Sequence, residues 1–194
     1  MLAVDVETAG LHGSAIQLGV SMRDHRGSEL HSRDELWRLP PGELIEKRAQ
    51  AVHGIDAAML EETGVDALPA LRELCALVCA AVETGRCMVV AHNAAFDATR
   101  LNDTAERHGG IGRAVVEPRH VFCTMQAARG PAGLLDARGA PKNPKLLELL
   151  GALGIRPEKQ IEGFKQHHAL SDARATALAF QAGVRKGWWP AKPA

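Results

Sequence analysis

The hydrophobic and polar positions near the start of the chain alternate in short blocks that predict three β-strands. Residues 2–6 are short and β-prone, and residues 15–20 form a second apolar run. Residues 29–39 form a third run, which ends at a Pro-Pro-Gly segment. Arg26-Gly27 provides a turn between the second run and the third. We therefore expect these strands to form an antiparallel meander.

The spacing of apolar residues becomes helical after Pro69. Residues 71–82 repeat at helical intervals, and Pro69 suits a first helical turn. Further helices are predicted at residues 95–108, 145–153 and 169–186, and two short buried strands at residues 87–91 and 119–123. Together these elements predict an α/β fold with a mixed five-stranded sheet flanked by helices. Residues 130–144 and 156–168 are predicted to be long loops.

Length and composition indicate one globular domain. The chain has 194 residues, of which 46% are hydrophobic, and a domain of that size folds without disulfides. Since no apolar run approaches the roughly 20 residues that span a bilayer, and the first residues do not resemble a signal peptide, we expect a cytoplasmic protein without a membrane partner. Residues 1–187 form the predicted domain and residues 188–194 a C-terminal tail. Within the tail, Trp188 and Trp189 are predicted to pack against the domain or at a dimer contact.

Charge is distributed unevenly along the chain, although the net charge is zero. Residues 1–99 carry 8 basic and 15 acidic residues, whereas residues 100–194 carry 15 and 8. Such asymmetry can mark an acidic metal site beside a basic face that binds phosphate, but scattered solvated charge explains it more simply. The cysteines form no Cys-x-x-Cys pair, which argues against a zinc ribbon, and Cys75 and Cys79 are predicted to face the core.

Asp5 and Glu7 are acidic residues within the first predicted strand. Side chains two apart on a strand share a face, so both carboxylates point the same way while Val4 and Val6 point to the other face. Neighbouring carboxylates repel each other, and a bound divalent cation such as Mg²⁺ removes that cost. Taken alone, however, the pair fits the solvent face of an edge strand better than a metal site.

A second cluster, with the sequence HNAAFD at residues 92–97, follows the fourth predicted strand and starts a helix. Open sheets place their ligand sites beyond the carboxyl ends of strands, which is where Asp97 would point. Helix-start chemistry alone would explain Asn93 as an N-cap and Asp97 as an acid favoured by the helix dipole. It does not explain His92 or Phe96.

A third cluster, HHALSD at residues 167–172, opens the last predicted helix. Asp172 falls in the first turn of that helix, and His167 lies just before it at the end of a polar loop. Helix-start chemistry with histidines in a polar loop explains this cluster equally well when it is taken alone.

The three clusters together, in the order Asp-x-Glu, His-Asn-x-x-Phe-Asp and His-x-Ala-Leu-x-Asp, resemble the DEDD exonuclease superfamily in its histidine-containing branch. The resemblance covers nearly the whole chain. Within the branch the sequence is most similar to the exonuclease X group, on the strength of VAHNAAFD at residues 90–97, CTM at residues 123–125 and the histidine run before Ala169. Many relatives have Asp-Thr where this chain has Cys123-Thr124, and Ala9 replaces a common threonine, which puts no metal ligand in doubt.

The resemblance implies an RNase H-like fold and a 3′→5′ exonuclease that hydrolyses DNA from a 3′ end with two Mg²⁺ or Mn²⁺ ions, releasing 5′-mononucleotides. The implied metal ligands are Asp5, Glu7, Asp97 and Asp172. The family spacing puts the general base five residues before the last aspartate, which selects His167 and leaves His168 without a catalytic role.

Several residues are implied on the substrate side of the site. Thr8 would lie near the terminal 3′-OH, and Leu11 and Phe96 would pack against terminal bases, although Phe96 serves equally well as a core anchor. His92 and Asn93 would support the site through hydrogen bonds. The His53-Gly54-Ile55 segment matches a further substrate-side segment of the family.

Alternative functions share the same residues. An RNA-trimming 3′→5′ exoribonuclease would use this site and differ in its tolerance of a 2′-OH, which the sequence does not reveal. A non-catalytic module that binds nucleic acid is disfavoured because all four carboxylates and the spaced histidine are present. The oligomeric state stays open, with a homodimer as one possibility.

Overall fold

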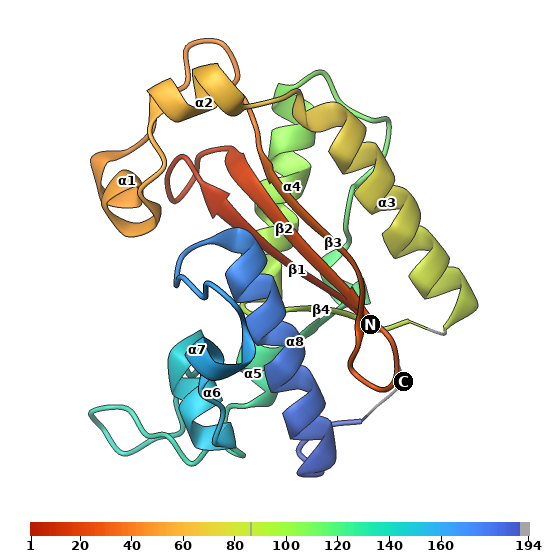
Figure 1. Cartoon of the computed structure of the whole chain (residues 1–194), viewed down its shortest axis with the longest axis vertical. Coiled ribbons are helices and arrows are strands. Elements are labelled where there is room, and N and C mark those ends of the chain that lie inside the picture. The colour runs from red at the N-terminus through yellow and green to blue at the C-terminus, as the bar shows by residue number, and fades with distance from the viewer. Residues whose placement is uncertain (86, 191–194) are drawn as a thin grey trace.

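A mixed five-stranded sheet forms the centre of the computed structural model, which describes residues 1–85 and 87–190. Its strands are β1 (Leu2–Thr8), β2 (Ala15–Arg23), β3 (Glu29–Leu36), β4 (Val89–Ala91) and β5 (Val121–Cys123), in the order β3-β2-β1-β4-β5 (Figure 1). Antiparallel pairing joins β1 to β2 and β2 to β3, whereas β1, β4 and β5 run parallel. The predicted fold class and meander are therefore confirmed.

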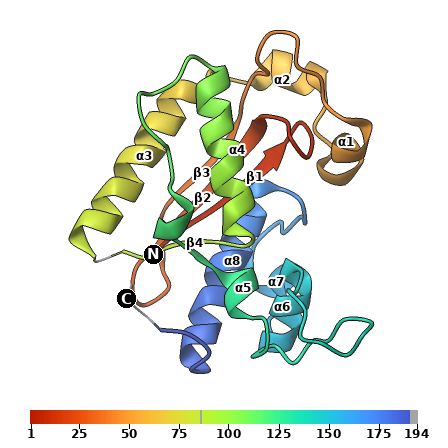
Figure 2. The same cartoon turned by 180° about the vertical axis from the view of Figure 1, so that it is seen from behind.

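Helices cover both faces of this sheet. α3 (Ala67–Thr84) and α4 (Ala94–Arg107) pack on one face, and α8 (Ala169–Arg185) packs on the other, with α6 (Leu146–Leu153) against it. Figures 1 and 2 show this arrangement from opposite sides, with α8 in front of the sheet in one view and α4 in front in the other. None of the helices in the described residues has the length and apolar character needed to span a bilayer.

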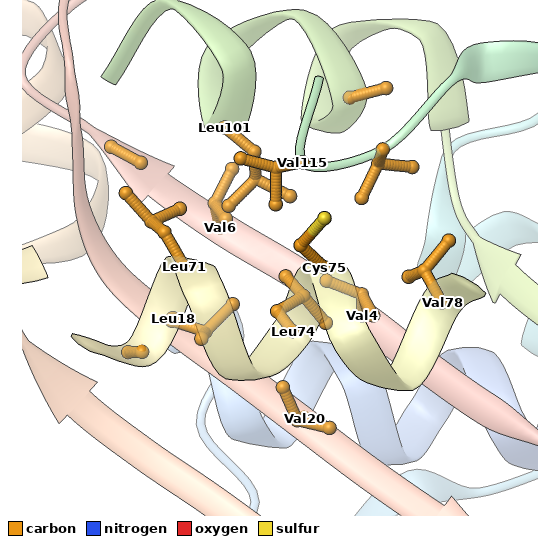
Figure 3. Close-up of a cluster of buried hydrophobic side chains, with 14 of the residues drawn as sticks. Val4, Val6, Leu18, Val20, Leu71, Leu74, Cys75, Val78, Leu101 and Val115 are labelled. Carbon is orange, nitrogen blue, oxygen red and sulfur yellow. The ribbon is translucent and has the colours of Figure 1, made fainter. Parts of the chain in front are cut away.

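An apolar cluster fills the space between β1 and the helices α3 and α4. Val4 and Val6 of β1 pack with Leu71 and Leu74 of α3 and with Leu101 of α4, as Figure 3 shows. Each of these five side chains is at most 6% exposed. The same cluster contains Cys75 as a buried free thiol, with Cys79 packed against its edge, so the prediction that both cysteines face the core is confirmed.

Short helices lie between the predicted elements. They are α1 (Lys47–His53), α2 (Ala57–Thr63), α5 (Thr124–Ala127), α7 (Pro157–Gln160) and a 3₁₀ turn at Pro118–His120. The last two correct the predictions of a loop over residues 156–168 and of a strand starting at residue 119. The third strand ends at Leu36 rather than at residue 39. Such helices bury few side chains, so they lack the long apolar period that reveals a helix in a sequence.

Helix α8 packs on the sheet from its first residue, Ala169, and Trp189 packs against its C-terminal half. A Cβ atom built on Gly19 of β2 would lie 2.1 Å from the carbonyl carbon of Ala169, so only glycine lets the helix start this close to the strand. Trp189 is 7% exposed, and its indole N–H donates to the carbonyl of Phe180 at 2.8 Å. The packing interpretation is therefore confirmed for this tryptophan, while residues 191–194 of the predicted tail lie outside the described residues.

Candidate active site

Strand alternation turns Asp5 and Glu7 of β1 toward the α8 side of the sheet. Val4 and Val6 occupy the opposite face, as the alternation predicted. Ala3, which has the same parity as the two acids, packs in the cluster formed by α8. Glu7 is only 9% exposed, so its carboxylate lies at the edge of a packed interior and not on an open strand face. The edge-strand explanation is therefore wrong, because β1 is the central strand of the sheet.

Asp97 enters the site from the first turn of α4. Asn93 precedes the helix in the left-handed conformation, with φ of 74°, and makes no side-chain capping bond. Asp97 is 5% exposed, and its Oδ2 atom has no hydrogen-bond partner among the described residues. Asn93 therefore occupies the predicted N-cap position without capping the helix through its side chain, and Asp97 has a buried oxygen without a partner among the described residues.

Asp172 enters from the first turn of α8 and is 7% exposed. Its Oδ2 atom accepts a hydrogen bond of 2.9 Å from the backbone N–H of His167. Its Oδ1 atom, like Oδ2 of Asp97, is buried and has no partner within the described part of the chain. Buried polar atoms are nearly always satisfied in folded proteins, so these two oxygens point to a missing ligand.

Burial, helped for three of the four acids by the charge of neighbouring acids, raises the pKa values of these carboxyl groups. The pKa of Asp5 lies well above its usual range because the group is buried and because Asp97, Asp172 and Glu7 are nearby. Burial, and then the charge of Asp172, raises the pKa of Glu7 to about 8, with Lys165 opposing the shift. Burial raises the pKa of Asp97 to about 8 and that of Asp172 to about 6. Four acids from three elements therefore share one poorly solvated space.

A divalent cation fits this donor set. Carboxylate oxygens of Glu7 and Asp172 and a ring nitrogen of His167 all lie within 4.8 Å of one another. Hard cations such as Mg²⁺ and Mn²⁺ prefer carboxylate oxygens, and such an ion would offset both the cost of burying ionised carboxylates and their mutual repulsion. The two unpartnered aspartate oxygens would complete such a site.

The two adjacent histidines face different surroundings. His167 has a left-handed backbone, with φ of 57°, and its ring lies beside Glu7 and Asp172. Desolvation and then the charge of Lys145 lower its pKa. The Nε2 atom of His168 instead lies 3.3 Å from Oδ2 of Asp34, on β3. The structure thus brings His167, and not His168, to the carboxylates.

His53 and His92 bond to the protein backbone near the carboxyl ends of the parallel strands β1 and β4, respectively. His53 is 4% exposed; its Nδ1 accepts the N–H of Ile55 at 2.9 Å, so Nε2 carries the proton that it donates to the carbonyl of Thr8, 3.2 Å away. The Nε2 of His92 lies 3.1 Å from the carbonyl of Pro144, and burial lowers the pKa of this ring to about 4. Both rings hold chain segments in place, and direct substrate contact by them stays a prediction.

The remaining predicted substrate residues differ in their exposure. Thr8 is 8% exposed at the end of β1, and Leu11, in the following loop, is 64% exposed. Arg107 donates to the carbonyl of His12 at 2.8 Å, which ties that loop to α4. Phe96 is half-buried, with the Arg100 guanidinium 5.9 Å from its ring centre, so part of the ring stays accessible.

Four residues near the site were not identified from the sequence. Lys145 and Lys165 place positive charge beside His167 and Glu7. Gln17 and Asp34 contact the start of α8 from β2 and β3. The only signal for Gln17 was a lone amide in the apolar run AIQLGV, and the lysines looked like ordinary surface charge.

Known proteins resemble this chain over nearly its full length. The exonuclease family model matches residues 2–180. Ribonuclease T of Shewanella frigidimarina is 30% identical over 97% of this chain and 86% of the relative, and ribonuclease T of Blochmanniella pennsylvanica is 28% identical over 99% and 89%. Exonuclease X bound to 5′ overhanging duplex DNA superimposes with a TM-score of 0.65 at 20% identity, over 98% of this chain and 94% of that one. Exonuclease I of E. coli, bound to a dT13 oligonucleotide, superimposes with a TM-score of 0.71 at 18% identity. The match covers 94% of this chain and 40% of that one.

Proposed function

This chain belongs to the exonuclease family and is a 3′→5′ exonuclease, and on that premise we propose that it degrades DNA from the 3′ end and releases 5′-mononucleotides. Family membership also implies use of a divalent metal. The observation that carries the proposal is the convergence of the four acids with His167, since hydrolysis of a phosphodiester needs both an activated water and charge stabilisation at the leaving oxygen.

We assign the acids to two cation positions. Asp5, Glu7 and Asp172 would hold the first ion, and Asp97 together with Asp5 would hold the second. Two such ions would activate the attacking water and stabilise the leaving 3′ oxygen. The unpartnered oxygens of Asp97 and Asp172 support the assignment.

His167 would act as the general base that takes the proton from the attacking water. Its ring lies beside two of the acids, and its lowered pKa keeps the imidazole neutral, and so able to accept a proton, at neutral pH. As the water oxygen bonds to phosphorus, the bond to the 3′ oxygen breaks and the new 5′-phosphate leaves with the released nucleotide. Lys145 and Lys165 lie where they can attract the phosphates of the strand.

Recognition of the strand end would rest on contacts that tolerate any base. We propose that exposed Leu11 and the accessible edge of Phe96 pack against terminal bases, and that Thr8 and Asn93 lie near the terminal sugar. Apolar and stacking contacts work for every base because every base has an aromatic face.

A second candidate is an exoribonuclease that trims RNA 3′ ends. The relatives named ribonuclease T favour the exoribonuclease. The structural neighbours bound to DNA, exonuclease X and exonuclease I, favour the DNA exonuclease. Both candidates use the same carboxylates and His167, and they differ in whether the site accepts a 2′-OH.

Digestion of end-labelled DNA and RNA oligonucleotides of one sequence, in Mg²⁺, tests these proposals together. We expect 5′-mononucleotides from the 3′ end, with DNA consumed faster than RNA, and no cleavage of a circular single strand. The variant Glu7→Gln, purified in parallel, controls for contaminating nuclease. Faster RNA consumption would establish the second candidate, and cuts within the circle would contradict exonuclease action.

A further inference from the structure

Gln17 is a buried amide near the start of β2, directly opposite Glu7 in the β1–β2 ladder. It is 4% exposed, and a buried amide is costly unless its donors and acceptor are satisfied. Its carbonyl Oε1 accepts the backbone N–H of Ala169 at 3.1 Å, and its Nε2 donates to Oδ1 of Asp34 at 2.8 Å. One side chain therefore ties the sheet to the start of α8.

Asp34 determines which way this amide faces. An ionised carboxylate only accepts hydrogen bonds, so it requires the nitrogen of Gln17 on its side and leaves the oxygen facing α8. The first N–H groups of a helix have no partner within the helix. The N-cap residue His168 makes no side-chain capping bond, and Gln17 supplies the acceptor from a neighbouring strand.

Gly19 brings the same two elements into backbone contact. A Cβ at this position would lie 2.1 Å from the carbonyl carbon of Ala169 and 2.2 Å from its oxygen. Because Gly19 and Gln17 point to the same face of β2, the close approach and the hydrogen bond fix one junction. That junction lies three residues before Asp172 and two residues after His167.

We propose that Gln17 is a positioning residue that sets where Asp172 and His167 stand relative to Glu7. The inference rests on the proposed roles of those three residues. Glu7 and Gln17 share one rung of the sheet, Gln17 holds Ala169, and the N–H of His167 bonds Asp172. The Nε2 atom of His168 lies 3.2 Å from Nε2 of Gln17 and 3.3 Å from Oδ2 of Asp34, so the ring of His168 also contacts this pair.

The first test is the variant Gln17→Leu, which removes the contacts with Ala169, Asp34 and His168 at similar volume. Loss of a group that orients metal ligands typically costs about 10–100-fold in metal affinity or activity, and we expect a loss in that range in both. Calorimetric titration with Mn²⁺ on the substrate-free protein gives the affinity, and steady-state assays give kcat and KM. We expect kcat to fall while KM for the oligonucleotide changes little.

A matched control separates positioning from general destabilisation. Ser21→Ala removes a buried side chain's hydrogen bond to Glu29, of 2.7 Å, from the same face of β2 but away from the start of α8. It should lower the melting temperature while leaving Mn²⁺ affinity and kcat unchanged.

A rescue experiment tests the hydrogen bond itself. Gln17→Glu places a second carboxylate against Asp34 and should impair Mn²⁺ binding. Adding Asp34→Asn restores the wild-type net charge and lets the new amide donate to the new carboxylate, whose other oxygen can accept from Ala169. The double variant should recover most of the affinity and kcat that Gln17→Glu loses.

The proposal is overturned if folded Gln17→Leu binds Mn²⁺ and turns over like the wild type, or if the double variant stays as impaired as Gln17→Glu. Should Gln17→Leu fail to fold, the comparison of Gln17→Glu with the double variant Gln17→Glu, Asp34→Asn tests the positioning role alone. Parallel assay of Glu7→Gln keeps the two proposals apart. Full activity there contradicts the proposed function, whereas an inactive Glu7→Gln beside a fully active Gln17→Leu contradicts only the positioning role.

Discussion

The two faces of β1 are buried to a similar degree and yet contribute to the protein in opposite ways. Val6, 6% exposed, packs between α3 and α4, and Glu7, 9% exposed, lies beside α8 with three other acids. Each buried methylene of the first face contributes about 0.8 kcal/mol to stability. Each buried carboxyl of the second face resists ionisation, as the raised pKa values show. The valine face thus contributes only packing, whereas the opposite face combines packing at Ala3 with the chemistry of its acids.

Removal of metal should have the largest effect, because it leaves the carboxylate face without the cation that its acids require. We expect excess EDTA to abolish exonuclease activity and added Mg²⁺ or Mn²⁺ to restore it, as measured by release of label from a 3′-labelled oligonucleotide. Undiminished hydrolysis by metal-stripped protein in excess chelator would exclude the assigned mechanism.

The next effect distinguishes the two adjacent histidines. His167→Ala should lower kcat by about 10²–10⁴-fold through loss of the general base, with Mn²⁺ binding largely retained. His168→Ala removes a partly exposed contact with Asp34, of a kind that contributes about 0–1 kcal/mol, and should cost far less. Turnover of both variants in saturating Mg²⁺ checks this. An inactive His168→Ala beside an active His167→Ala would reverse the assignment.

A smaller effect should appear in the stability of the metal-free protein. The pKa values of Glu7 and Asp97, about 8 when folded, lie above the usual value of about 4 that applies when unfolded. Each group binds its proton more tightly in the folded state, so its contribution is fully present below about pH 4 and is lost as the pH rises through about 8. The melting temperature in EDTA should therefore fall between about pH 5 and about pH 8.

Mg²⁺ should raise that melting temperature most at the upper end of this range, where ionised carboxylates bind it without losing protons. Glu7→Gln combined with Asp97→Asn removes two of the titrating groups and should flatten the pH dependence. A wild-type melting temperature in EDTA that is constant over the range would show that the acids do not interact as described.

The smallest effect on catalysis should come from the apolar face. Val6→Ala removes two buried methyl groups and should lower the free energy of unfolding by about 2 kcal/mol, measured by urea denaturation. Turnover per folded molecule should stay unchanged. A fall in kcat without a loss of stability would show that the two faces are not independent.

Local sequence patterns predicted most of the secondary structure and the acids of the site. They did not predict contacts between residues that lie far apart in the sequence. Alternation in β1 predicted both faces, and the spacing of three short motifs identified the acids that the structure brings together. The contact between Gln17 and Ala169 joins residues 152 positions apart, so no local period reports it. The choice between His167 and His168 rested on family spacing, because the conformation that separates their rings depends on β2 and β3.

The left-handed backbone at His167 matters to anyone who screens variant libraries for heat tolerance. A non-glycine residue in that conformation carries a cost of about 1–2 kcal/mol, which glycine largely avoids. Uncharged replacements for the buried acids would also be favoured, because they remove the cost of burying ionised carboxylates. A screen that scores only survival at high temperature would therefore enrich thermostable variants that lack nuclease activity. Libraries of this enzyme need to be sorted on turnover and survival together.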